Sequence, residues 1–94
     1  MIIVRNCFIA KPGCAGKLAA QLKDATTTAQ LPGCRIMTDL TGDFNRVIME
    51  YEAESISGFE ESMKRYMTDG VMREKLKGYT DHWVSGSREI FQVV

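Results

Sequence analysis

The segment Ile2–Ala10 alternates like a β-strand and is mainly apolar on both of its faces. One face carries Ile3, Arg5, Cys7 and Ile9, and the other carries Ile2, Val4, Asn6, Phe8 and Ala10. Because successive side chains of a strand point to opposite sides of the sheet, this pattern predicts a strand that is covered on both faces and lies centrally. The chain has only 94 residues, so few other elements remain to cover those two faces.

Three segments have apolar residues at helical spacing. The predicted helices are Cys14–Ala29, Ile56–Met67 and a short continuation that carries Val71, Met72, Leu76 and Tyr79. Ser57 and Glu60 fit a capping box near the start of the second helix. Thr68-Asp69-Gly70 then interrupts its apolar stripe, so we expect that helix to be broken.

Three further segments alternate with the period of two that is typical of strands. They are Cys34–Thr41, Arg46–Glu54 and Ser87–Val94. Between the first two lies Thr41-Gly42-Asp43-Phe44-Asn45, which is rich in turn-forming residues and predicts a hairpin. We expect Ile36 and Leu40 to lie on the same side of the first of these strands.

The order strand, helix, strand, strand, broken helix, strand is that of the ferredoxin-like fold. We therefore predict an α+β fold of βαββαβ order, with a four-stranded antiparallel sheet and one domain over residues 1–94. Right-handed crossovers place the first and third strands in the centre and both helices on one face. The opposite face of the sheet is left without helices.

An uncovered face is costly for this chain because its first strand is apolar on both sides. Apolar surface left in water forgoes roughly 25 cal/mol per Å². A second copy of the sheet is the simplest cover, so we expect a homodimer in which the two open faces pack together, as in a dimeric α/β barrel. The alternative is a monomer with a partly solvated open face.

Charge and hydropathy exclude several classes of partner. The chain has 12 Lys and Arg against 12 Asp and Glu, which argues against a nucleic-acid-binding protein. No apolar run approaches the roughly 18 to 20 residues that span a bilayer, and the first residues do not form a secretory signal. We expect no nucleic acid and no membrane among its partners.

The cysteines and the one histidine do not suggest a metal site. Cys7, Cys14 and Cys34 are an odd set without a Cys-x-x-Cys pair, and His82 does not complete a zinc site with them. An odd number of cysteines also argues against a disulfide framework. We therefore expect reduced thiols, a cytoplasmic location and no bound metal.

Three stretches carry a resemblance to a known superfamily. They are the opening strand that runs into Lys11-Pro12-Gly13, the hairpin Thr41–Glu52 and the closing segment Ser85–Phe91. With these stretches the chain resembles the dimeric α/β barrel superfamily, which includes antibiotic-biosynthesis-type monooxygenases, haem-degrading monooxygenases and NIPSNAP-like proteins. The resemblance implies a dimer of facing sheets with a pocket between the sheet and the helices of each subunit. A fold of this kind hosts many activities, so it does not establish a reaction.

The resemblance also implies candidate catalytic residues. Quinone-forming monooxygenases of the superfamily hold an acidic phenol in an apolar pocket and use no metal or flavin, so we expect no cofactor. The candidates in this chain are Asn6, Tyr66, His82 and Arg88, with Trp83 beside them. Haem-degrading members use an Asn, a Trp and a His. Asn6 matches the first, but Tyr66 and Leu76 stand near the other two positions, so that set is not reproduced.

Each candidate also has a structural interpretation. Asn6 can bond a neighbouring backbone group, Tyr66 can belong to the core, His82 can cap a helix end, and Arg88 can pair with an exposed carboxylate. The function we predict is binding of a small, largely apolar or aromatic molecule by a homodimer, with a monooxygenase-like activity on an aromatic or polyphenolic substrate. The alternative is a ligand-sensing or assembly module without catalysis.

Overall fold

The computed structural model, which describes residues 1–94, contains one antiparallel sheet of four strands in the order β2-β3-β1-β4. The strands are β1 (Ile2–Ala10), β2 (Arg35–Thr38), β3 (Arg46–Ala53) and β4 (Trp83–Gln92). β1 and β3 are central and pair over eight residues, from Ile2↔Ala53 to Ile9↔Arg46. The predicted α+β ferredoxin-like topology is confirmed.

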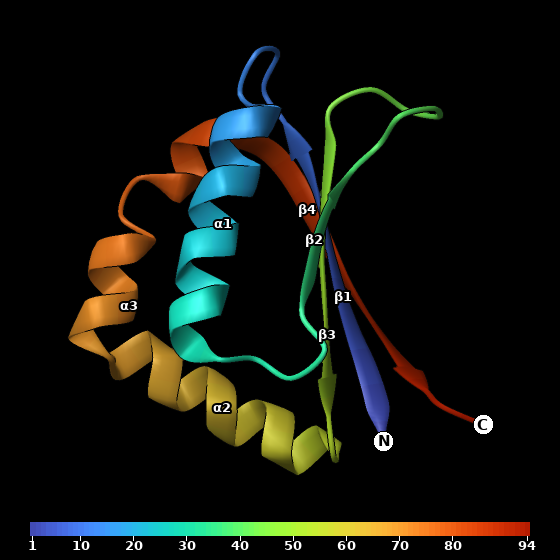
Figure 1. Cartoon of the computed structure of the whole chain (residues 1–94), viewed down its shortest axis with the longest axis vertical. Helices are drawn as coiled ribbons and strands as arrows, with labels where there is room; N and C mark the ends of the chain where they lie inside the picture. Colours follow the sequence, from blue (N-terminus) through green and yellow to red (C-terminus); the bar gives the residue numbers. More distant parts are fainter.

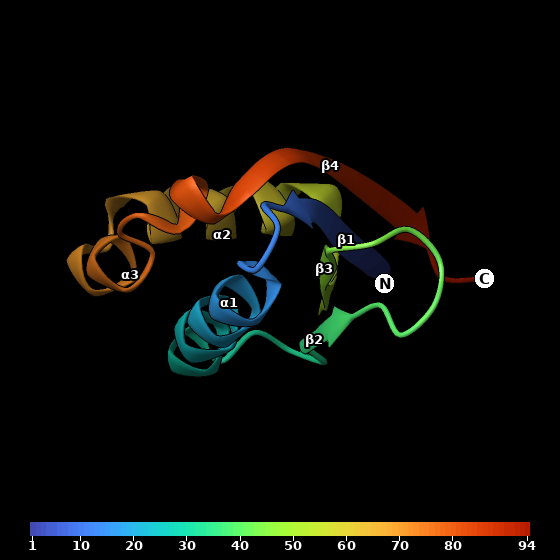
Figure 2. The same ribbon diagram turned by 90° about the horizontal axis from the view of Figure 1, so that it is seen from above.

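All helices lie on one side of the sheet, and the other side carries none (Figure 1, Figure 2). They are α1 (Ala15–Ala29), α2 (Ile56–Thr68), α3 (Gly70–Lys75) and a 3₁₀ turn (Tyr79–His82). None of them is long and apolar enough to cross a membrane. The side without helices is called the open face below.

The start of α2 at Ile56 agrees with the sequence prediction, but its cap does not. The predicted capping box at Ser57 and Glu60 is wrong, because the N-cap lies two residues before Ser57. Ser55 is its N-cap and accepts a hydrogen bond from the Gly58 amide at 3.1 Å. The predicted break is confirmed: Asp69 ends α2 in an extended conformation and caps α3 by accepting from the Val71 amide at 2.8 Å.

The edge strands also differ from the prediction. β2 ends at Thr38 rather than Thr41, and Leu40, predicted to face the same side as Ile36, is 98% exposed. β4 starts at Trp83 rather than at residue 87, because its pairing with β1 continues past a bulge to Ala10. β2 is therefore shorter, and β4 longer, than its apolar pattern indicates.

The core lies between the sheet and the helices and consists of two clusters. One contains Ile2, Val4, Tyr51 and Phe59, and the other contains Ala10, Leu18, Leu22 and Val47. Val4, Leu18 and Val47 are completely buried. Only one face of β1 is thus covered within a single chain, the face that carries Val4 and Asn6.

The open face combines apolar residues with an ion-pair network. The Glu50 carboxylate accepts from Arg5 at 3.0 Å and from Arg35 at 2.6 Å, and the Arg5 guanidinium lies 5.1 Å from the centre of the Phe91 ring. Glu50 is only 7% exposed although it is charged, and its two arginine partners satisfy the buried carboxylate. The two arginines lower the Glu50 pKa below its ordinary value of 4.5, against the opposing effect of burial.

Candidate functional site

A cavity of about 370 Å³ lies between the helix-covered face of the sheet and the helices. Hydrophobic residues make up 13 of its 17 lining residues. From the sheet come Asn6, Phe8, Met49, Tyr51 and Arg88; from α1 and the segment after it Leu22, Ala25, Thr26, Ala29 and Leu31; and from α2, α3 and the turn after them Met63, Tyr66, Met67, Met72, Arg73, Leu76 and Tyr79. Its volume lies within the range of small-molecule sites, and its apolar lining with few polar groups is also typical of such sites.

The sheet places two polar side chains next to each other in this cavity. Asn6 on β1 lies directly opposite Arg88 on β4, and Arg88 Nε donates a hydrogen bond to Asn6 Oδ1 at 2.7 Å. The guanidinium also lies over the Phe59 ring, with its carbon 5.2 Å from the ring centre. Because Arg88 can only donate, this bond orients the Asn6 amide with its oxygen toward Arg88 and its nitrogen away.

Two polar atoms on buried residues of the lining have no protein partner. Asn6 is 5% exposed and Tyr51 is 4% exposed, yet neither the Asn6 amide nitrogen nor the Tyr51 hydroxyl makes a hydrogen bond within the chain. Neither atom is fully enclosed, because the only fully enclosed side-chain polar atom without a partner is Trp83 Nε1. Buried polar groups usually have partners, so both atoms are free to bond a molecule inside the cavity.

The Tyr51 hydroxyl acts as a donor at neutral pH. Burial raises the pKa of Tyr51 to about 12, and the nearby positive charge of Arg88 offsets this only in part. The phenol therefore keeps its proton and does not serve as a base near pH 7.

The lining is positively charged and contains no acidic group. Arg73 and Arg88 both line the cavity, and no Asp, Glu, His or Cys does. Neither arginine forms a salt bridge, whereas Arg5, Arg35 and Arg46 all pair with carboxylates within 3.4 Å. The cavity can thus stabilise negative charge, but it holds no carboxylate or imidazole that would take a proton.

The structure brings three of the four sequence-predicted site residues to this cavity. Asn6, Tyr66 and Arg88 line it, and His82 does not. His82 ends the 3₁₀ turn, where its backbone carbonyl accepts from the Lys11 amide at 2.9 Å. Arg88, expected on its structural interpretation to pair with a carboxylate, instead bonds Asn6.

Trp83 packs beside the cavity without lining it. Its ring lies 5.4 Å from the Phe8 ring and 6.2 Å from the Tyr79 ring, centre to centre. Phe8 and Tyr79 themselves meet edge-on at 6.3 Å and both line the cavity. The three rings form one wall, with Trp83 in the layer behind.

Sequence reasoning missed Tyr51 and Arg73 as members of the site. Tyr51 belongs to the predicted strand Arg46–Glu54, and its side chain lies on the face that carries Val4 and Asn6 on β1. Pairing the two predicted strands in sequence order would therefore have placed Tyr51 on the same face of the sheet as Asn6. Arg73 reaches the cavity from α3, whose placement the sequence pattern does not indicate.

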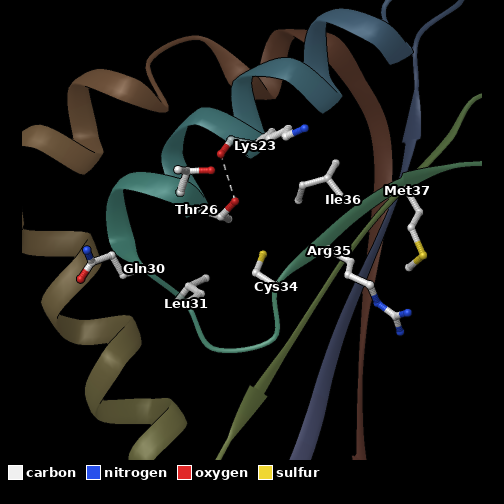
Figure 3. Close-up of a pocket in the computed structure, with 9 residues that line it drawn as sticks. Lys23, Thr26, Gln30, Leu31, Cys34, Arg35, Ile36 and Met37 are labelled. Atoms are coloured by element: carbon white, nitrogen blue, oxygen red, sulfur yellow. Dashed lines mark hydrogen bonds between the residues drawn. The ribbon is translucent and has the colours of Figure 1, made fainter.

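A second hollow of about 450 Å³ lies between α1 and the edge strand β2 (Figure 3). Cys34 and Ile36 point toward α1, whereas Arg35 and Met37 lie on the other side of β2 (Figure 3). Four of its nine lining residues are hydrophobic, and Lys23, Thr27 and Gln30 are exposed. The Thr26 hydroxyl at its wall is already bonded to helix carbonyls at 2.8 and 3.3 Å. This groove therefore offers no unpartnered buried polar group.

No cluster of three or more His, Cys, Asp or Glu side chains is placed to hold a metal ion. The three cysteines are all free and half-buried. Cys34 lies in the groove of Figure 3, and Cys7 lies on the open face opposite Ile48.

The fold is similar to solved structures of two kinds of protein. An uncharacterised NIPSNAP domain protein from Burkholderia xenovorans matches over 100% of this chain and 95% of its own, with a TM-score of 0.86 and 12% identity. A NIPSNAP family protein from Agrobacterium tumefaciens matches over 99% and 92%, with a TM-score of 0.87 and 12% identity. An antibiotic biosynthesis monooxygenase matches over 100% and 99%, with a TM-score of 0.75 and 10% identity.

These likenesses confirm the ferredoxin-like fold of the chain. The identities are low, so the likeness carries the fold and no reaction. No protein-family model matches the chain, and no curated protein matches it.

Proposed function

We propose that the protein binds a small, largely apolar organic molecule in the cavity between its sheet and its helices. The observation that carries this proposal is an apolar lining that includes two polar atoms without a protein partner, Asn6 Nδ2 and the Tyr51 hydroxyl, on residues that are otherwise buried. Such atoms give a bound molecule hydrogen-bonding partners, as the few polar groups of small-molecule sites do.

Methionine supports this use of the cavity. Met49, Met63, Met67 and Met72 line it, and the flexible thioether side chain adapts to flat or irregular ligands. A library of aromatic and alicyclic molecules screened by thermal shift tests the proposal. Binders should raise the melting temperature of the wild type but not that of Met72→Trp, which fills the cavity. Equal shifts for both would contradict it.

A specific reaction consistent with this site is oxygenation of an aromatic or polyphenolic substrate. The cavity has groups that stabilise an anion and no base, so the substrate would have to be an acidic phenol that ionises without a protein base. In this proposal Asn6 and Arg88 hold the ionised oxygen and Tyr66 contributes to the wall. The likeness in fold to an antibiotic biosynthesis monooxygenase supports it.

Oxygen consumption separates this enzyme from a ligand sensor without catalysis. Polyphenols and quinols are screened with the wild type, Asn6→Ala and His82→Ala. An enzyme should consume oxygen, lose most of its turnover in Asn6→Ala and keep it in His82→Ala, because His82 does not line the cavity. Ligand binding without turnover would favour the sensor or assembly module.

We also propose that a second copy of the chain covers the open face. Three arginines and three glutamates lie on that face together with Ile3, Cys7, Ile9, Ile48 and Phe91: Arg5, Arg35 and Arg46 with Glu50, Glu52 and Glu89. Asp39 pairs with Arg46 at its edge, so positive and negative side chains are nearly balanced. A two-fold partner presents the same nearly balanced set, which favours pairing between like faces.

Sedimentation at micromolar concentration tests the dimer. The expected mass is twice the chain mass of 10.6 kDa. Phe91→Lys, on the open face, should shift the protein toward monomer, whereas Val71→Lys, on the helical side, should not; the two side chains are 41% and 56% exposed. A wild type that sediments as a monomer would contradict this proposal and leave the ligand proposal intact.

A further inference from the structure

The cavity has positively charged side chains and no negatively charged ones, whereas the whole chain has no net charge. It is lined by Arg73 and Arg88 and by no acidic residue, although the chain as a whole carries equal numbers of positive and negative side chains. Neither arginine is neutralised by a carboxylate within 4.0 Å. Two cations without a carboxylate partner at the opening of an apolar cavity attract a negatively charged ligand.

The free polar atoms around Arg88 are hydrogen-bond donors. Arg88 uses Nε on Asn6 Oδ1 and makes no other hydrogen bond, so its two terminal nitrogens remain available. The bond turns the Asn6 amide nitrogen away from Arg88, and that nitrogen has no partner. The Tyr51 hydroxyl is protonated and also has no partner. The Thr26 hydroxyl, by contrast, donates a hydrogen bond to the Leu22 carbonyl at 2.8 Å.

These donors extend from the opening of the cavity into its interior. Arg73 and Arg88 are exposed, whereas Asn6 and Tyr51 are buried. The Arg88 guanidinium is held in place from two sides, by Asn6 at 2.7 Å and by the Phe59 ring at 5.2 Å. An acceptor group placed beside Arg88 would meet charged and neutral donors whose positions are already fixed, while the methionines and leucines surround an apolar body.

Resting on the proposed function, we infer that the ligand of this cavity is an organic anion: an apolar, ring-sized body that carries one carboxylate, sulfonate or phenolate. Arg88 is its counter-ion, and Asn6 Nδ2 and the Tyr51 hydroxyl are the neutral donors to the same group. Asn6 is a positioning residue for Arg88 as well as a direct donor. Hydrogen bonds from a guanidinium to an anion are about twice as strong as neutral ones.

A matched pair of fluorescent probes tests this inference. Anilinonaphthalene sulfonate carries one negative charge, and phenylnaphthylamine has the same aromatic body without it. The sulfonate should bind the wild type at least about tenfold more tightly, with one molecule per chain. Arg88→Gln should weaken sulfonate binding about tenfold to a hundredfold and change binding of the neutral probe less than about twofold.

The matched control is Arg65→Gln, which removes the same charge from the surface of α2, outside the cavity. The Arg65 side chain donates a hydrogen bond only to the Ser62 hydroxyl, at 3.1 Å. It should leave both probes unchanged. Arg88→Lys, which keeps the charge but not the planar fork, should restore part of the sulfonate affinity.

A second variant guards against misfolding of Arg88→Gln. Asn6→Asp is isosteric and places a carboxylate 2.7 Å from Arg88 Nε, so it should fold and should lose the preference for the sulfonate through neutralisation of Arg88. Equal affinity of the two probes for the wild type, or equal losses in Arg88→Gln and Arg65→Gln, would overturn the inference while the ligand cavity stands. Failure of both probes to bind would overturn the proposed function as well.

Discussion

The substitution Asn6→Leu tests whether Asn6 serves ligand binding or the stability of the fold. Three free-energy terms follow from the structure. Leucine removes an amide nitrogen that has no protein partner but is not fully enclosed, so the gain is about 0–2 kcal/mol, less than for a fully buried group. It adds apolar surface at a central strand position, worth roughly another 1 kcal/mol because the site borders a cavity. It loses the bond from Arg88, which costs about 1 kcal/mol because the exposed guanidinium is rehydrated.

The sum predicts that Asn6→Leu is between unchanged and about 2 kcal/mol more stable than the wild type, although it should lose its preference for an anionic probe. Urea unfolding followed by circular dichroism measures the difference. Leu18→Ala, at a position that is completely buried in the core, is the reference and should cost about 3–5 kcal/mol. A loss above about 2 kcal/mol in Asn6→Leu would show that Asn6 serves the fold and would refute the reasoning.

Two further predictions concern the open face and the start of α2. Because the folded-state pKa of Glu50 lies below its ordinary value of 4.5, its ion pairs stabilise the fold above that pH and lose their effect as the pH falls through the lowered value. Glu50→Gln should therefore be less stable than the wild type at pH 7, with the two converging on acidification; a difference that is independent of pH would contradict this. Ser55→Ala should cost about 1 kcal/mol through loss of the N-cap and Ser57→Ala clearly less, and thermal melts showing the reverse order would restore the capping box at Ser57.

The strand order could be predicted because β1 is long and apolar on both faces, and because right-handed crossovers leave few alternatives. The end of β2 could not. Its pairing stops at Thr38, and the next residue, Asp39, accepts from the Arg46 amide at 3.2 Å and from Arg46 Nε at 3.4 Å. This side-chain bond starts the loop, so Leu40 leaves the sheet in spite of its apolar character.

The candidate site was predictable in the sheet and not in the helices. Asn6 and Arg88 meet because their strands pair in register, which alternation and strand order together indicate. His82 was a candidate by its chemistry alone, and whether it reaches the cavity depends on a short 3₁₀ turn that no periodicity reveals. The same holds for Arg73, since the angle between α2 and α3 is set by the cap at Asp69.

The methionine methyl groups give the most direct test that this cavity is the ligand site. Four of the six methionines line it, at positions 49, 63, 67 and 72, whereas Met1 does not and Met37 lies on the side of β2 that faces away from α1 (Figure 3). In protein labelled with ¹³C at the methionine methyl groups, anilinonaphthalene sulfonate should shift the four cavity resonances along one binding curve and leave Met1 and Met37 in place. A shift of Met37 alone, or no shift in the four at saturation, would contradict the account.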